Sequence, residues 1–134
     1  MRILIDYRPA LHQPTGVGEH IHNLSQAIAA ESASQSNVSI TLFSSSLRHR
    51  LPINIVDNAH IVDRRIPVRC LNWLWHHAEW PSIELLAGTF DIAHSPHPLL
   101  IPSKLAACFV TIHDLYFLNH PNHTSGEIRT DYPK

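Results

Sequence analysis

The sequence predicts an open α/β fold in which parallel strands alternate with flanking helices. Two observations carry this prediction. Short continuous apolar runs, such as Ile3-Leu4-Ile5, are typical of strands that are buried on both faces of a parallel sheet. Between such runs, apolar residues recur every three or four positions, which is the period of an amphipathic helix. The alternation of these two patterns along one chain favours an α/β sheet.

The first half of the chain carries one helix pattern and three strand patterns. Val17, Ile21, Leu24 and Ile28 lie four, three and four positions apart, which places them on one side of a helix. The strand patterns are short apolar or alternating segments. In order, we expect a strand at 3–5, a turn-rich stretch at 8–18, a helix at 18–31, and strands at 38–43 and 59–63.

The second half continues the alternation. The segment 69–88 is predicted to be helical, with Pro81 breaking it and opening a second short helix that ends before Gly88. Further strands are expected at 90–94 and 107–112, and the pattern at 107–112 is the strongest in the chain. A last helix begins at 127–132. Because the sequence stops in its first turns, we expect one incomplete domain over 1–134, with exposed edge strands and apolar surface.

Composition limits the partners. The chain has 134 residues, with 10 Lys and Arg against 11 Asp and Glu, and a net charge of -1. This balance argues against a nucleic-acid partner held by a basic field and against a polybasic membrane surface. No apolar stretch is long enough for a signal peptide or a membrane span. Cys70 and Cys108 are too far apart for a thiolate metal motif. We therefore expect a reduced cytoplasmic protein.

A glycine pair follows the first predicted strand and opens the first predicted helix. Gly16, Val17 and Gly18 lack the third glycine of the dinucleotide-binding fingerprint, because position 21 is Ile. Glycine lets a ligand approach the backbone closely, and a helix N-terminus offers unpaired N–H groups to a phosphate. The alternative is a turn that merely requires two glycines.

His113 and Asp114 follow the strongest predicted strand. In open α/β sheets, ligands bind outside the carboxyl ends of the strands. A histidine at that place can donate a hydrogen bond or move a proton near neutral pH. The alternative is a histidine that only caps the strand end through a bond to local backbone.

The remaining histidines and aromatic residues point to chemistry less directly. The chain has 12 histidines, several of them in close pairs, yet none of the pairs belongs to an H-E-x-x-H motif. We therefore expect no metal. The tryptophans at 73, 75 and 80 are expected to lie in the core or at an interface, while Tyr116 and Phe117 could line a cleft.

Three blocks of residues, in this order, carry a resemblance to one enzyme family. The first contains Asp6, Arg8 and the Gly16–Glu19 segment, the second runs from Phe90 to Pro96, and the third runs from Val110 to Leu118. Together they resemble the N-terminal domain of family-four (group 1) glycosyltransferases of the GT-B fold. The resemblance covers residues 2 to about 132.

This resemblance implies a Rossmann-like domain that shapes the acceptor side of a two-domain enzyme. Such an enzyme moves a sugar, with retention, from a nucleotide-sugar donor to a glycan or lipid acceptor, and it needs no metal and no cofactor. The implied partners are the donor, the acceptor, the missing C-terminal domain and a peripheral membrane contact, but no nucleic acid. Because the C-terminal domain grips the nucleotide, the chain alone is expected to be inactive.

The resemblance also implies roles for individual residues. Gly16, Val17 and Gly18 would approach the donor diphosphate, and His113 would contact the transferred sugar at the reaction centre. The other implied binding candidates, for the acceptor or the phosphates, are Arg8, Glu19 and Asp114.

Two other functions stay open. The abrupt end of the sequence favours a non-catalytic binding or assembly module that pairs with a separate C-terminal subunit. The histidine content suggests a metal-dependent hydrolase as a further hypothesis, which would require a bound transition metal.

Overall fold

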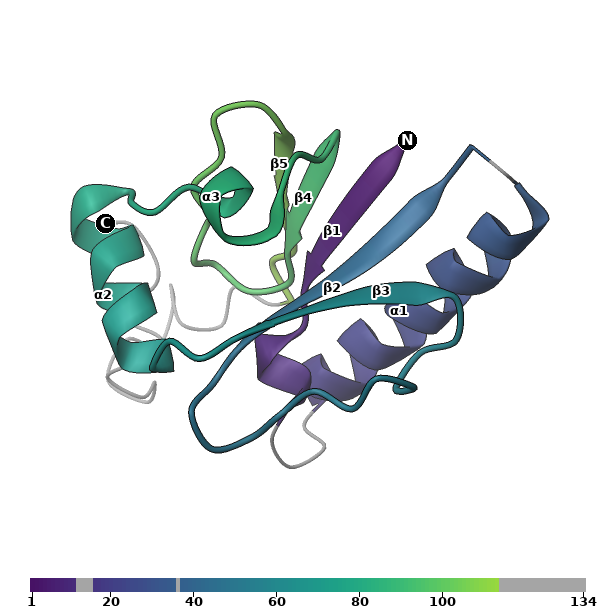
Figure 1. Cartoon of the computed structure of the whole chain (residues 1–134), viewed down its shortest axis with the longest axis horizontal. Coiled ribbons are helices and arrows are strands. Elements are labelled where there is room, and N and C mark those ends of the chain that lie inside the picture. The colour runs from purple at the N-terminus through teal and green to yellow at the C-terminus, as the bar shows by residue number, and fades with distance from the viewer. Residues whose placement is uncertain (12–15, 36, 114–134) are drawn as a thin grey trace.

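The computed structural model describes residues 1–11, 16–35 and 37–113. Their strands form one five-stranded parallel sheet with the order β3-β2-β1-β4-β5 (Figure 1). The Rossmann-like α/β class predicted from the sequence is confirmed. The strands are β1 (Arg2–Asp6), β2 (Ser39–Ser45), β3 (Ala59–Arg64), β4 (Ile92–Ser95) and β5 (Ala107–Val110).

Helices cover both faces of the sheet and complete two apolar clusters. They are the 3-10 helix η1 (Arg8–Ala10), α1 (Gly16–Ser34), α2 (Val68–Ala78) and α3 (Ile83–Ala87). One cluster joins Ile5 and Leu42 to Ile21 of α1. The other joins Leu4 and Phe43 to α2 and α3. Because side chains alternate along a strand, neighbouring residues of β1 enter different clusters, and both faces of β1 are buried.

The predicted elements occur in the predicted order, with shifted boundaries. The first helix runs from Gly16 to Ser34 rather than over 18–31, so the glycine pair forms its first turn. The segment 69–88 breaks at Pro81 as predicted, and Gly88 ends α3 with a φ of 94°. The short helix η1 lies within the stretch that was predicted only as a turn. The helix predicted at 127–132 lies outside the described residues.

Strand β5 is shorter and more exposed than its apolar sequence indicates. It ends at Val110 rather than at residue 112, and all four of its residues are exposed because it forms one edge of the sheet. Phe109 and Ile112 are 54% and 55% exposed, respectively. Among the described residues, β5 is thus an edge strand with exposed apolar side chains. No helix among the described residues is both long and apolar enough to cross a membrane.

Candidate functional site

The carboxyl ends of β1, β4 and β5 lie at the edge of the sheet where α1 begins. In a parallel sheet with this topology, the loops at that edge are the usual place for a ligand. Strands β1 and β4 pair directly, and β5 pairs with β4. Polar side chains that follow these three strands therefore come close together.

The central group at this edge is a buried ion pair between Asp6 and Arg8. Arg8 donates from Nε to Asp6 Oδ1 over 2.8 Å and from Nη2 to Oδ2 over 2.6 Å. Its third contact runs from Nη1 to Asn72 Oδ1 on α2 over 2.8 Å. The guanidinium also lies 4.6 Å from the ring centroid of Trp75, which favours a cation–π contact.

This geometry bears on the role expected of Arg8. Both partners of the ion pair are buried, at 5% exposure for Arg8 and 0% for Asp6. Arg8 is directed at a carboxylate, an amide and an aromatic ring rather than at solvent. In this conformation Arg8 binds Asp6 and Asn72 within the protein, whereas the resemblance implies that it contacts an acceptor or a phosphate.

Asp6 is ionised despite its burial. Burial alone would raise its pKa, but the charge of Arg8 and the hydrogen bonds from Arg8 and His97 outweigh that effect and hold the pKa well below its ordinary value. His97 donates from Nε2 to Asp6 Oδ2 over 3.2 Å and accepts the Leu99 amide at Nδ1 over 3.3 Å. In these two bonds Nε2 acts as the donor and Nδ1 as the acceptor.

Three further imidazoles gather where β4, β5 and α1 meet. The rings of His20 and His113 lie edge to face with centroids 5.1 Å apart. His113 donates from Nε2 to the carbonyl oxygen of Pro96 over 2.9 Å, so it does make the backbone contact of the capping alternative. His94 Nε2 lies 2.7 Å from Thr111 Oγ1.

His94 is held in its neutral form. Burial lowers its pKa, and the neighbouring charges of His20 and His113 lower it further, while Asp6 opposes the shift. A neutral imidazole in this position can accept or donate a hydrogen bond but resists becoming a cation.

The glycine segment lies at the same edge. Gly16 and Glu19 are exposed, Val17 is half-buried and Gly18 is buried. A Cβ placed on Gly16 would meet nothing within 4 Å, so the space beside its backbone is open. His20 follows Glu19 directly, so its ring contact links the first turns of α1 to His113.

A cavity of about 540 Å³ lies beside the first turns of α1. Gly18, Glu19 and Asn23 line it together with Tyr7 and His22. The Tyr7 hydroxyl and His22 Nδ1 share a hydrogen bond of 2.6 Å, and burial raises the pKa of Tyr7, which keeps the phenol protonated. A carboxylate, an amide and an imidazole around one cavity suit a ligand rich in hydroxyl groups.

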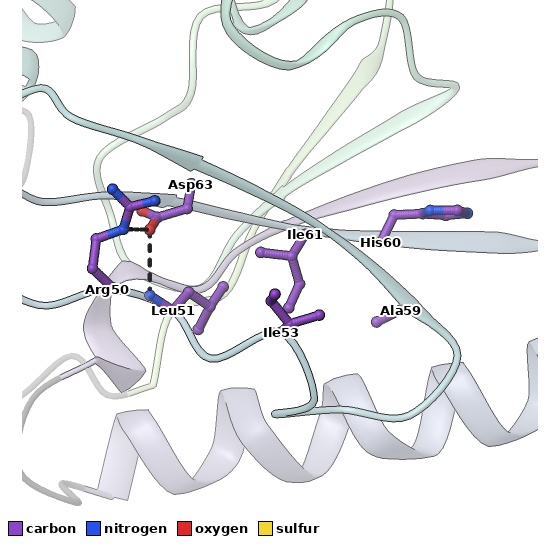
Figure 2. A pocket seen from close by; sticks show the side chains of 7 residues that line it. All are labelled: Arg50, Leu51, Ile53, Ala59, His60, Ile61 and Asp63. Carbon is purple, nitrogen blue, oxygen red and sulfur yellow. Dashed lines mark hydrogen bonds and ion pairs between the residues drawn. The ribbon is translucent and has the colours of Figure 1, made fainter.

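A second cavity, of about 450 Å³, lies away from this edge between β3 and the loop before it (Figure 2). Arg50 forms an ion pair with Asp63 at its wall, over 2.6 Å. Ile53 and Ile61 form its apolar side. None of the residues predicted for the site lines this cavity.

The structure brings together five of the predicted positions. Gly16, Val17, Gly18 and Glu19 begin α1, and His113 approaches them through His20. Arg8 is buried against Asp6. Asp114, Tyr116 and Phe117 lie outside the described residues. Trp75 is buried in the core, whereas Trp73 and Trp80 are exposed. Within the described ranges, no group of three or more His, Cys, Asp or Glu side chains could hold a metal ion.

Sequence reasoning did not select His97 or the Tyr7–His22 pair. His97 could have been found from its place, since it comes two residues after the end of β4 at the edge where Asp6 ends β1. Tyr7 follows Asp6 and could have been found by the same rule. The contact of Asn72 with Arg8 joins distant segments and has no local signal.

No family model, curated protein or solved structure matches the chain. The edge of the sheet combines open backbone at the start of α1, imidazoles opposite it, and a cavity alongside that suits a ligand rich in hydroxyl groups. This combination fits recognition of an anionic group next to a polyhydroxylated one.

Proposed function

We propose that the chain is the N-terminal, acceptor-side domain of a retaining glycosyltransferase of family four, acting in the cytoplasm. The enzyme would move a sugar from a nucleotide-sugar donor to a glycan or lipid acceptor. The observation that carries the proposal is the contact between His20 and His113, because it brings the start of α1 and the end of β5 to one edge. An anion at the helix start would then lie beside an imidazole.

Each part of the edge has a role in that reaction. The amides at Gly16 and Gly18, with the dipole of α1, would stabilise charge that develops on the departing nucleotide diphosphate. His113 carries its proton on Nε2, where it donates to Pro96, which leaves Nδ1 to accept a hydrogen bond from a sugar hydroxyl. Glu19 and Asn23 would orient acceptor hydroxyls in the adjoining cavity.

The described residues form only one side of such a site. Catalysis needs a second surface that holds the nucleotide and excludes water from the sugar. We therefore propose that this chain acts together with a C-terminal domain and is inactive alone. Binding, rather than turnover, is the measurement that tests the chain itself.

The test is a titration of the isotopically labelled chain with UDP, GDP and their glucose and mannose conjugates, followed by NMR. We expect the amide signals of Gly16 and Gly18 and the ring signals of His113 to shift. Gly16→Val and His113→Ala should each reduce these shifts, while His60→Ala, an exposed change on β3, should leave them intact. No shift with any of these compounds, or equal shifts in all three variants, would overturn the proposal.

A second candidate function is supported by the exposed apolar residues of β5. Phe109, Val110 and Ile112 are exposed beside a strand edge that pairs with no other strand among the described residues, which suits the docking of a separate subunit. In that case the chain would be a non-catalytic assembly module. Phe109→Lys should then abolish co-purification with the partner subunit while the nucleotide titration stays blank for the wild-type chain.

A further inference from the structure

Strand β3 forms one edge of the sheet, and its outer side pairs with no strand among the described residues (Figure 1). The Arg64 carbonyl oxygen accepts the Ser46 amide over 3.0 Å, so the backbone of Arg64 faces β2. Because the direction of the backbone groups alternates along a strand, those of Ala59, Ile61 and Asp63 face away from β2. An edge of this kind can pair with another extended chain.

The loop that joins β2 to β3 runs beside this edge without pairing with it (Figure 2). No backbone–backbone hydrogen bond joins residues 50–58 to β3. The contacts are made instead by one side chain of the strand. Arg50 Nε lies 2.6 Å from Asp63 Oδ2, and the Leu51 amide donates to the same oxygen over 3.4 Å. The loop therefore stands off from the strand along most of its course.

The cavity of about 450 Å³ lies between β3 and this loop. Ala59 and Ile61 of the strand and Leu51 and Ile53 of the loop give it apolar walls. Ile53 is 83% exposed, although Leu51 anchors the same loop in the core. One residue of extended chain in a sheet takes up roughly 160 Å³, from a rise of about 3.4 Å, a strand spacing of about 4.8 Å and a thickness of about 10 Å. The cavity can therefore hold about three residues of an extended peptide.

One end of the cavity carries a cation that is held in position. The side chain of Arg50 is 52% exposed, whereas that of its partner Asp63 is only 8% exposed. The contact with Asp63 uses Nε, so the outer Nη groups of Arg50 can bind a carboxylate through two parallel hydrogen bonds, as is typical of arginine. A carboxylate on the ligand is therefore expected at this end of the cavity.

We propose that β3 binds an extended peptide of a partner protein, with apolar side chains at alternate positions and a carboxylate next to Arg50. A row of backbone N–H and C=O groups at every second residue is complementary to another strand. A helix already uses its own backbone groups, and a lipid chain has none to offer. This binding does not depend on sugar transfer, because none of the residues proposed for that reaction lines the cavity.

The test is fluorescence anisotropy of the labelled pentapeptide Val-Thr-Val-Thr-Asp, titrated with the whole chain. Its valines and its aspartate share one face of a strand, and its threonines share the other. Two analogues carry N-methyl groups on alternate backbone amides, one at the odd positions and one at the even positions. Because only alternate amides of a strand face its partner, one analogue should bind like the parent peptide and the other roughly ten-fold more weakly or worse.

Variants of the chain locate the binding surface. Ile53→Asp places a charge on the apolar wall of the cavity and should weaken binding by roughly ten-fold. The matched control is Leu105→Asp, because Leu105 is also largely exposed, at 71%, but lies in the loop before β5. It should bind like wild type. Arg50→Gln should weaken binding of the parent peptide more than that of a peptide ending in asparagine, which isolates the contact between the two charges.

The proposal is overturned if the parent peptide does not bind, or if both methylated analogues bind as tightly as the parent. It is also overturned if Leu105→Asp lowers binding as much as Ile53→Asp does. A dimer in sedimentation equilibrium that Ile53→Asp dissociates and the peptide does not would identify a second copy as the ligand, and the proposal would then fail. Nucleotide titrations of Ile53→Asp are expected to match wild type, so this proposal and the proposed function can fail separately.

Discussion

The imidazole rings of His20 and His113 meet edge to face, with centroids 5.1 Å apart. His20 lies in the first turns of α1, and His113 follows β5 at the other end of the described chain. Their contact joins the glycine segment to the strand end that the sequence marked separately as a candidate site. Because both lie where parallel strands end, one ligand could touch both.

Removing the charge of Asp6 is expected to destabilise the fold strongly. In Asp6→Asn, Arg8 would stay buried without its carboxylate, which typically costs about 3–5 kcal/mol. Urea unfolding monitored by fluorescence measures the change in the free energy of unfolding. The control is Asp91→Asn, because the exposed ion pair of Asp91 with Arg2 should be worth about 1 kcal/mol or less. Equal losses in the two variants would contradict the role assigned to Asp6.

Acid should remove the same stabilisation in the wild-type chain. The folded-state pKa of Asp6 is lower than the ordinary 3.8, so the unfolded state takes up a proton first as pH falls. The contribution of Asp6 is complete above pH 3.8 and is lost progressively below it. A plot of unfolding free energy against pH should therefore fall less steeply in acid for Asp6→Asn than for wild type.

His94 should make the free energy of unfolding depend on pH in a second range, nearer neutral pH. Its pKa is below the ordinary 6.5 in the folded state, so the unfolded chain binds the proton more readily as pH falls below 6.5. Stability should therefore be highest above that value and decrease below it. His94→Gln should flatten this part of the curve, whereas His60→Gln on the exposed face of β3 should not. A histidine NMR titration would identify the group directly.

The two glycines with open space around them should respond in opposite directions to alanine. Neither a Cβ on Gly16 nor one on Gly88 would meet an atom within 4 Å. Gly16 begins α1, and Gly16→Ala should stabilise the chain by about 0.4–1 kcal/mol by restricting the unfolded state. Gly88 has a φ of 94°, so Gly88→Ala should be destabilising despite the free space. Thermal unfolding of both variants checks this contrast.

The two tryptophans of α2 allow the effect of truncating a buried side chain to be compared with that of truncating an exposed one. Trp75 is 2% exposed, and Trp75→Ala should lower the free energy of unfolding by about 3–5 kcal/mol because it leaves a cavity beside Arg8 and Phe43. Trp73→Ala, on the exposed side, should change it by about 0.5 kcal/mol or less. Chemical denaturation distinguishes the two. A large effect of Trp73→Ala would mean that this side chain supports the fold.

The spacing of apolar residues in the sequence was enough to predict which segments form strands and which form helices, because burial of one or both faces imposes that spacing. Leu4 and Ile5 predicted a strand covered on both faces and are fully buried. Strand order does not follow from the same signal. The run at 107–112 gave the strongest strand pattern, yet β5 is an exposed edge strand, because pairing partners are set by tertiary contacts.

The sequence pointed to the edge of the sheet where the candidate site lies, but not to the contacts among its buried side chains. The rule that polar residues after parallel strands meet at one edge selected His113 and the glycine segment. It could not reveal that Arg8 turns back onto Asp6 and reaches Asn72, since that depends on where α2 packs. The family resemblance implies that Arg8 contacts a ligand. In the structure Arg8 is buried and binds Asp6 and Asn72.

The Asp6–Arg8 pair joins three parts of the molecule through hydrogen bonds. Through Asn72 it reaches α2, and through His97 it reaches the loop after β4. Asn72 and His97 lie on segments that are far apart in the sequence, and each binds a member of the same ion pair. The loss of this one ion pair would therefore loosen α2 and the loop after β4 together.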